Sequence, residues 1–347
     1  MVENLGIIGG GQLGSLLCTA AKKLNIKTII FSDDENAPAQ NFCDEFIFGK
    51  YNDQEKINLF TSKVDLVTFE FENIPVETLK LIDEVKKVLP KPRINKIIQN
   101  RLSEKDFVNK LNIRTTSYVG VKNENELISN VNLIPGILKT TTLGYDGKGQ
   151  FKINDVKDLE RLNIDYSKDY ILEKLVKLKQ EISVIITRFG HQKFEIYEPI
   201  ENYHEDQILR TSKIPANISE KISNLSIDHA TIVADELDYI GTLCVEYFID
   251  KNDNLYLNEI APRVHNSGHL TINSHNISQF ENHIRAICGL EKIKVKKLHD
   301  ANMKNLIGDE ISNYRNKNFK DSEFFFDYLK KEIKNNRKMG HLTTIKL

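Results

Sequence analysis

Apolar and polar positions along the first ninety residues follow two alternating patterns, which predict strands and helices in turn. Short apolar runs have the length of buried strands, and the segments between them carry apolar residues at helical spacing. The strand candidates are 5–8, 27–31 and 64–71, and the helix candidates are 15–24 and 77–88. Strands that alternate with helices favour a parallel sheet. Pro90 and Pro92 then mark the expected edge of a first domain.

The pattern changes near residue 96, where strands begin to outnumber helices. The further strand candidates are 136–139, 150–153, 170–175, 181–188 and 193–199, and the further helix candidates are 96–101, 104–111, 218–237 and 277–288. Two apolar runs at 241–249 and 254–260 flank the sequence Asp-Lys-Asn-Asp. Because aspartate and asparagine favour tight turns, this segment predicts a β-hairpin.

Composition and charge narrow the class of protein. A chain of 347 residues is long enough for about two to three domains. Its 48 basic and 49 acidic side chains give a formal net charge of −1, which supports neither a nucleic-acid coat nor a polybasic membrane anchor. The four cysteines are widely spaced, which favours free thiols over disulfides or a zinc site. The uncharged stretch 5–21 is too short and too polar to span a bilayer, so we expect a cytoplasmic protein that binds neither nucleic acid nor membrane.

A glycine-rich turn follows the first strand candidate. Gly9, Gly11 and Gly14 have the GxGxxG spacing, and Asp33 and Asp34 end the next strand candidate. This arrangement is typical of a dinucleotide site. Glycine lets any phosphate approach the backbone, and a helix N-terminus favours any anion. The motif alone therefore leaves open a nicotinamide enzyme and other phosphate-binding proteins.

A second glycine-rich segment begins at Lys139 and runs Thr-Thr-Thr-Leu-Gly-Tyr-Asp-Gly-Lys-Gly to Gln150. It places a lysine at the end of a strand, ahead of a loop that can fold over nucleotide phosphates. The segment lacks the Gly-Lys-Ser/Thr ending of a Walker A loop. A flexible hairpin with a solvated lysine accounts for the pattern equally well.

Two glutamates lie on the two strands of the predicted hairpin, Glu246 on the first and Glu259 on the second. The turn brings them close together, where two carboxylates repel each other unless a cation joins them. Magnesium is commonly held by one or two carboxylates together with substrate phosphates. A surface glutamate and a separate salt bridge are the alternative, but the loop after Lys139 favours the metal. Arg263 and His265 follow closely and are suited to binding a phosphate or a carboxylate.

Together these segments resemble the ATP-grasp superfamily, and within it the 5-(carboxyamino)imidazole ribonucleotide synthetase family. The resemblance is carried by GIIGGGQLG, FEFENIP, GYDGKGQ, ILRTS, LNEIAPRVHNSGH, SQFENHIRAICG and RKMGH, which span residues 6–341. It implies a protein of the α/β and α+β classes. The implied parts are a Rossmann-like domain at 1–95, an ATP-grasp domain at 96–290 and a small C-terminal β-rich domain at 291–347.

The resemblance also implies an activity and its site residues. The reaction would carboxylate the amino group of 5-aminoimidazole ribonucleotide with bicarbonate and ATP in purine biosynthesis, using two magnesium ions in a homodimer. The nucleotide would contact Arg101, Lys139, Gly144, Tyr145, Asp146, Gly147, Lys148, Gly149, Gln150, Glu173, Lys174, Leu175, Val176, Glu181, His204, Asn258 and Glu259, and the metal would contact Glu246 and Glu259. The ribonucleotide would contact Gln12, Leu13, Glu72, Tyr145, Asp146, Arg263, His265, Asn266, Lys331 and Arg337, with Glu70 and Lys330 as alternatives to Glu72 and Lys331. Arg263, Asn266 and Lys148 would be the catalytic residues.

Three other functions compete with this one. A formate-dependent glycinamide ribonucleotide transformylase also uses ATP to activate a small carboxylic species, but the forms APRVHNSGH and GYDGKGQ favour the synthetase. A nicotinamide dehydrogenase leaves the hairpin carboxylates without a role. A non-catalytic nucleotide-binding module is disfavoured because both carboxylates, the phosphate lysine and the loop are all present.

Overall fold

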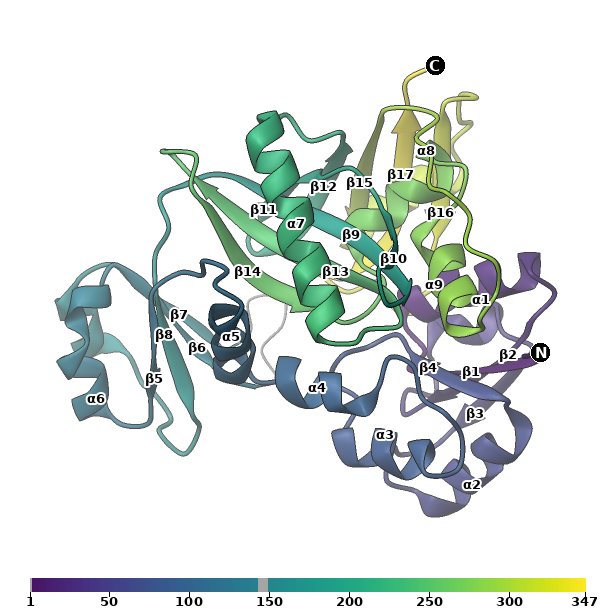
Figure 1. The fold of residues 1–347 in the computed structure, drawn as a ribbon, viewed down its shortest axis with the longest axis horizontal. Helices are drawn as coiled ribbons and strands as arrows, with labels where there is room; N and C mark the ends of the chain where they lie inside the picture. Colours follow the sequence, from purple (N-terminus) through teal and green to yellow (C-terminus); the bar gives the residue numbers. More distant parts are fainter. Residues whose placement is uncertain (1, 143–148) are drawn as a thin grey trace.

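The computed structural model describes residues 2–142 and 149–347, and its N-terminal part is built on a parallel sheet (Figure 1). The strand order is β3-β2-β1-β4. The strands are β1 (Asn4–Ile8), β2 (Lys27–Ser32), β3 (Glu45–Phe48) and β4 (Leu66–Phe69), and the helices are α1 (Gln12–Lys23), α2 (Gln54–Lys63) and α3 (Val76–Asp83), with a 3₁₀ turn η1 (Pro38–Asn41). The predicted parallel sheet is confirmed. The helix predicted over 77–88 ends earlier, because Lys87 and Leu89 exchange backbone hydrogen bonds with Val67 beside β4.

A small antiparallel sheet with the order β5-β8-β6-β7 forms a separate lobe, at the left of Figure 1. Two helices, α4 (Pro92–Ile98) and α5 (Arg101–Lys110), lead into it. Its strands are β5 (Tyr118–Val121), β6 (Gly136–Thr140), β7 (Gln150–Ile153) and β8 (Tyr170–Lys174), accompanied by α6 (Glu124–Ser129), η2 (Val131–Leu133) and η3 (Val156–Arg161). Lys139 lies opposite Gln150 at the ends of β6 and β7.

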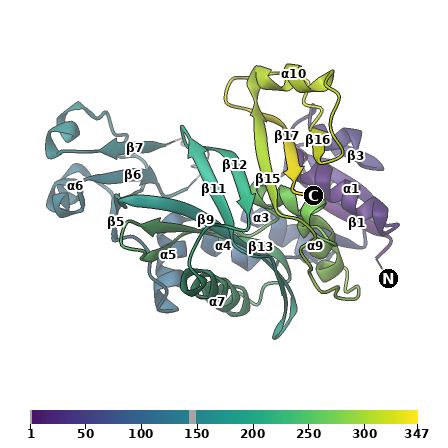
Figure 2. The ribbon, with the colours of Figure 1, turned by 90° about the horizontal axis from the view of Figure 1, so that it is seen from above.

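The largest sheet has nine strands and contains the predicted hairpin. Its path is β14-β13-β9-β11-β12-β15-β17-β16, and β10 pairs with β9. The strands are β9 (Leu178–Gly190), β10 (Lys193–Ile196), β11 (Ile200–Glu205), β12 (Ile208–Ile214), β13 (Gly241–Asp250), β14 (Leu255–Ala261), β15 (Ala301–Ile307), β16 (Glu323–Asp327) and β17 (Lys338–Ile345). The C-terminal strands continue this sheet, since β15 pairs with β12. Figure 2 shows the sheet curving across the molecule from above.

Helices cover the sheet and join it to the N-terminal part. The remaining helices and turns are α7 (Glu220–Glu236), η4 (Asn266–Leu270), α8 (Thr271–Ser274), α9 (Gln279–Ile287), η5 (Gly308–Ile311) and α10 (Ser312–Arg315). The core under α7 includes Val184 of β9 and Val245 of β13. Because side chains alternate along a strand, Glu246 faces the other side of the sheet. In the described part of the chain, no helix combines the length and the apolar character that a bilayer crossing requires.

His283 of α9 forms hydrogen bonds with both the parallel sheet and the large sheet. Its Nδ1 accepts a hydrogen bond from the backbone of Thr242 on β13 at 3.1 Å, and its Nε2 lies 2.9 Å from Thr68 Oγ1 on β4. The ring is buried, and burial lowers the pKa of His283 to about 3. The imidazole is therefore neutral at neutral pH, which suits one accepting and one donating nitrogen.

Candidate functional site

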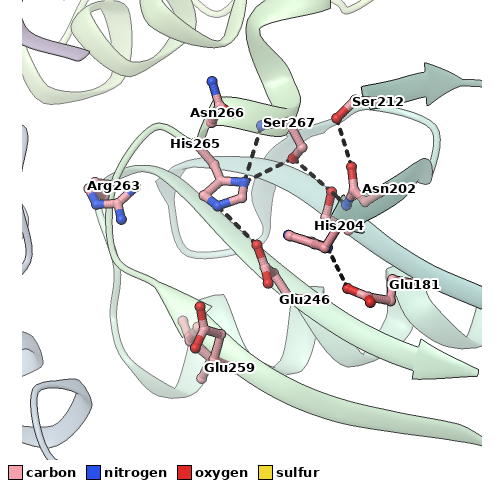
Figure 3. Close-up of polar contacts among 12 residues, drawn as sticks. Glu181, Asn202, His204, Ser212, Glu246, Glu259, Arg263, His265, Asn266 and Ser267 are labelled. Atoms are coloured by element: carbon pink, nitrogen blue, oxygen red, sulfur yellow. Dashed lines mark hydrogen bonds and ion pairs between the residues drawn. The ribbon is translucent and has the colours of Figure 1, made fainter. Parts of the chain in front are cut away.

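Glu246 and Glu259 face each other across the β13–β14 hairpin. They are register partners, and a bulge follows Glu246. His265 Nε2 lies 2.9 Å from Glu246 Oε1 (Figure 3). Burial alone would raise the pKa of Glu246, but His265, which is hydrogen-bonded to this carboxylate, outweighs burial and lowers the pKa. Cys244 Sγ, a Glu246 oxygen and a His265 ring nitrogen also lie within 4.8 Å of one another.

A cationic and a neutral group approach Glu259 from α5. Arg101 Nη1 lies 3.4 Å from Glu259 Oε2. Glu104, one helical turn further on, accepts a hydrogen bond from the backbone of Ile260 at 2.6 Å. Burial, and then the charge of Glu259, raises the pKa of Glu104 to about 8. Glu104 is therefore largely protonated at neutral pH. It adds little negative charge beside the carboxylates of Glu246 and Glu259.

Three buried charges form a cluster between β6, β8 and α5. Glu173 lies 3.1 Å from Lys139 Nζ and 3.3 Å from Lys105 Nζ, and it accepts a hydrogen bond from Thr116 Oγ1 at 3.1 Å. Burial opposes the charge of Glu173, but the two lysines outweigh it and lower the pKa to about 2. Burial lowers the pKa of Lys139. The cluster holds the Lys139 ammonium at the end of β6, beside the start of β7.

Residues 173–176, which the resemblance assigns to nucleotide contacts, lie at the end of β8. The backbone amides of Lys174 and Leu175 donate to Ser117 O at 2.8 Å and Pro135 O at 2.9 Å, and Val176 follows them. Across the large sheet, Glu181 of β9 lies 2.6 Å from His204 Nδ1 of β11.

Glu70 explains the glycine-rich turn before α1. Its carboxylate accepts hydrogen bonds from the backbone amides of Gly11 at 2.8 Å and Gly14 at 3.2 Å. A Cβ atom at Gly9 or Gly11 would lie within 2.9 Å of Glu70. The side chain of Glu70 therefore fills the space beside the turn in which a dinucleotide phosphate would have to lie. Burial raises the pKa of Glu70, against the opposing effect of these backbone hydrogen bonds.

A cavity of about 180 Å³ opens beside this turn. Its walls include two cationic side chains, three acidic ones and the glycine turn, namely Lys330, Arg337, Asp33, Asp34, Glu70, Gly9, Gly10 and Gly11. Lys330 Nζ donates to Gln12 Oε1 at 3.0 Å, whereas Lys331 Nζ donates to Asn36 Oδ1 at 2.6 Å and is exposed. The structure thus brings Lys330, not Lys331, into the wall of this cavity beside Arg337. The side chain of Leu13 is buried in the core, so only its backbone N–H is a candidate for the predicted ribonucleotide contact.

The loop after β14 carries Arg263 and Asn266, which contact residues outside the hairpin. Arg263 forms an ion pair through Nε with Glu72, and it also donates to Val264 O at 3.1 Å. Burial alone would raise the pKa of Glu72, but Arg263 outweighs it and lowers the pKa. Asn266 is buried, and both ends of its amide pair with Asn305 of β15. Asn266 points away from Glu246 in Figure 3.

Several predicted contacts fall on a segment without a structural description. Gly144, Tyr145, Asp146, Gly147 and Lys148 lie outside the described residues. Gly149 and Gln150 follow at the start of β7. Gly149 has a φ of 70°, and a Cβ atom there would lie 2.7 Å from Thr140 Oγ1, so both conformation and space require glycine.

Sequence reasoning missed Lys105 and Glu104, and it left Lys330 as an alternative. Arg101 and Lys105 are four residues apart on α5, so helical periodicity could have placed both on one face. The contact between Lys330 and Gln12 joins residues 318 apart in sequence. No local pattern selects it over its neighbour.

Comparison with known families assigns the three regions. The ATP-grasp domain family matches residues 106–280, the ribonucleotide synthetase preATP-grasp domain matches residues 2–99, and the phosphoribosylaminoimidazole carboxylase C-terminal domain matches residues 301–346. A curated relative, the N5-carboxyaminoimidazole ribonucleotide synthase of Brucella melitensis, is 38% identical, and the match covers 99% of this chain and 96% of that protein.

Solved structures agree in fold as well as in sequence. N5-carboxyaminoimidazole synthetase from Staphylococcus aureus, complexed with ADP, is 34% identical with a TM-score of 0.93, over 99% of this chain and 93% of that one. The synthase from Aspergillus clavatus, in complex with ADP and 5-aminoimidazole ribonucleotide, is 27% identical with a TM-score of 0.90, over 99% and 94%. These matches confirm the fold class and the resemblance predicted from the motifs. The chain belongs to the N5-carboxyaminoimidazole ribonucleotide synthase family of ATP-grasp proteins.

Proposed function

We propose that this chain carboxylates the amino group of 5-aminoimidazole ribonucleotide with bicarbonate and ATP, in purine biosynthesis. A bicarbonate oxygen takes the γ-phosphoryl group, and ADP leaves. The amine nitrogen then bonds to the carboxyl carbon, directly or after release of carbon dioxide, while phosphate departs and the amine loses a proton. The observation that carries the proposal is the loop after Glu259. Through the Arg263–Glu72 pair, this loop links the carboxylates of β13 and β14 to the side of the molecule where Lys330 and Arg337 line a cavity beside α1.

The nucleotide side is supported by charge and backbone geometry. Buried Lys139 and half-buried Arg101 offer cations to phosphates. Glu181 offers a carboxylate that can accept hydrogen bonds from ribose hydroxyls. The amides of Lys174 and Leu175 are already bonded within the lobe. In this proposal the base would be recognised by the backbone at Val176, which follows them.

Magnesium is proposed at the hairpin. The ion would be held by Glu246 and Glu259, which are register partners on paired strands and whose carboxylate oxygens are the ligands that magnesium prefers. When bound, magnesium neutralises phosphate charge during phosphoryl transfer. Arg101 already pairs with Glu259, so it also orients that carboxylate. We expect two ions, because two carboxylates and a polyphosphate can hold both.

The ribonucleotide side is proposed at the cavity of about 180 Å³. Lys330 and Arg337 supply two cations to its wall, which suits a monoester phosphate. Lys330 therefore replaces Lys331 as the proposed phosphate contact. Arg263, His265 and Glu72 lie on the side toward the hairpin, where the amine would meet the carboxyl group. We place Glu72 rather than Glu70 near the amine, because Glu70 is bonded to the glycine turn.

The resemblance also leads us to propose a cytoplasmic homodimer, with domain boundaries near residues 95 and 290. The first experiment is phosphate release from ATP and magnesium, with and without 5-aminoimidazole ribonucleotide and bicarbonate. Release that requires the ribonucleotide and rises with bicarbonate is the expected result. ATP binding without ribonucleotide-dependent release would contradict the proposed acceptor, and formate-dependent release with glycinamide ribonucleotide would favour the transformylase instead.

A further inference from the structure

A row of buried polar side chains runs through the large sheet to Glu246. Ser183 on β9, Asn202 on β11 and Ser212 on β12 stand on neighbouring strands, and Ser267 lies on η4 above them. The three serines are at most 1% exposed, and Asn202 is 6% exposed. Figure 3 labels Ser212, Asn202, Ser267 and His265 along one run of contacts that ends at Glu246. Burying polar groups is costly unless they are hydrogen-bonded, and the proposed reaction has no direct use for them.

Each link in this row is at hydrogen-bond distance. Ser212 Oγ donates to Asn202 Oδ1 at 2.8 Å, and Asn202 Nδ2 donates to Ser183 Oγ at 2.9 Å. The hydroxyl oxygens of Ser183 and Ser267 are 2.8 Å apart, and Ser267 Oγ lies 2.9 Å from His265 Nδ1. An amide nitrogen only donates, so Ser183 accepts from Asn202 and has its own proton available for Ser267. When Ser183 donates to Ser267, the proton of Ser267 is available for His265.

A backbone hydrogen bond favours one tautomer of the His265 ring. The backbone N–H of Ser267 donates to His265 Nδ1 at 3.3 Å. Because an N–H can only donate, Nδ1 is the acceptor nitrogen and the ring proton lies on Nε2. That nitrogen is 2.9 Å from Glu246 Oε1. With Ser183 donating to Ser267, every donor in the row from Ser212 to His265 points toward Glu246.

We propose that Ser183, Asn202, Ser212 and Ser267 are positioning residues that hold the Nε2–H of His265 on Glu246, and so fix this carboxylate for the metal. The inference rests on the proposed function, in which Glu246 is a magnesium ligand. With the ring proton on Nδ1, the Nε2 lone pair would face the carboxylate and repel it. Hydrogen bonds aligned in one direction polarise one another in a low-dielectric interior, so the distant members of the row also contribute.

The test compares two variants that each lose one buried hydroxyl. Ser267→Ala removes the link to His265. Thr187→Val is the matched control, because Thr187 is buried on β9 and pairs with Thr242 at 2.7 Å, outside the row. The first measurement compares the magnesium concentration for half-maximal ATP cleavage with the KM for ATP. The second records the ¹⁵N chemical shifts of the His265 ring in the ligand-free protein. A His265→Asn variant assigns the ring signals.

We expect Ser267→Ala to raise the half-saturating magnesium concentration by about 10-fold, with a much smaller change in the KM for ATP. Loss of a group that orients a metal ligand through hydrogen bonds typically weakens metal binding by this amount. Its His265 nitrogens should lose the shift difference of a fixed Nε2–H tautomer, and Thr187→Val should keep both wild-type values. Wild-type magnesium response and ring shifts in Ser267→Ala would overturn the proposal.

Two further results keep the test decisive. If Ser267→Ala does not fold, Ser212→Ala at the far end of the row is measured instead; a smaller change in the same direction supports the proposal, and no change overturns it. If the wild-type protein shows no ribonucleotide-dependent ATP cleavage, the proposed function fails. The ring shifts of the ligand-free variants still decide whether the row positions His265.

Discussion

Replacing Glu173 by glutamine removes the negative member of the buried cluster at the end of β6. Lys139 and Lys105 lie 3.1 and 3.3 Å from its carboxylate. Glutamine has nearly the same shape and can still bond to Thr116, so packing is preserved while the charge is lost. Two buried ammonium groups then face each other without a counter-charge. Such a change is expected to destabilise the fold strongly.

The size of the effect follows from the pKa of Glu173. It falls from 4.5 to about 2 on folding, because the lysines outweigh the cost of burial. At about 1.4 kcal/mol per pKa unit, this shift stabilises the fold by about 3 kcal/mol at neutral pH. Removing one partner of a buried ion pair costs a similar amount, about 3–5 kcal/mol. The stabilisation is present above pH 4.5 and is lost as the pH falls toward 2, so the difference between the variant and the wild-type protein should narrow in that range.

Urea unfolding followed by far-ultraviolet circular dichroism measures this difference, since the chain contains no tryptophan. Glu198→Gln is the matched control, because Glu198 pairs with Lys297 at 2.9 Å but its side chain is 47% exposed. That substitution should cost less than about 1 kcal/mol. A loss below about 1 kcal/mol in Glu173→Gln, or a loss that does not narrow at acid pH, would refute the reasoning.

Three further predictions concern the proposed metal site, the cavity and the junction between the sheets. Glu259→Gln should keep the fold by circular dichroism but lower ATP cleavage by at least about 100-fold, because phosphoryl transfer depends on charge stabilisation; full activity would remove this carboxylate from the metal site. Lys330→Ala and Arg337→Ala should each raise the KM for the ribonucleotide by about 10-fold or more with ATP binding intact, while Lys331→Ala should change it little; steady-state kinetics would show the reverse order if the assignment is wrong. Since burial lowers the pKa of His283 from 6.5 to about 3, the unfolded chain takes up the proton first, and stability should fall as the pH drops from about 6.5 toward 3. His283→Gln should reduce the slope of unfolding free energy against pH by about 1.4 kcal/mol per unit in that range, and an unchanged slope in urea titrations would contradict the buried neutral ring.

Features set by nearby residues were predictable from the sequence. The hairpin of Glu246 and Glu259 was predicted because a turn of four residues fixes both strands and their register. Strands β11 and β12 were missed, since Asn202 and Ser212 occupy buried positions where apolar residues would have revealed a strand. The groups that position the proposed metal site thus weaken the signal of the strands that carry them.

Contacts between distant residues were not predictable in the same way. The GxGxxG spacing left a nicotinamide enzyme open, but Glu70, 59 residues from Gly11, binds the turn. The glycines are needed to accommodate this carboxylate, and nothing near them in the sequence indicates it. The family resemblance, rather than periodicity, supplied the assignment of function.

The continuation of the large sheet by β15, β17 and β16 has a consequence for fragments of this protein. Residues Ala301–Lys304 of β15 pair with Thr211–Ile214, the C-terminal half of β12. A fragment ending after α9 would leave β12 with a row of unpaired backbone N–H and C=O groups. Such an open edge is a template for pairing with another chain. Truncation there should therefore yield self-associating material, so variants of the ATP-grasp region are better expressed with their C-terminal strands attached.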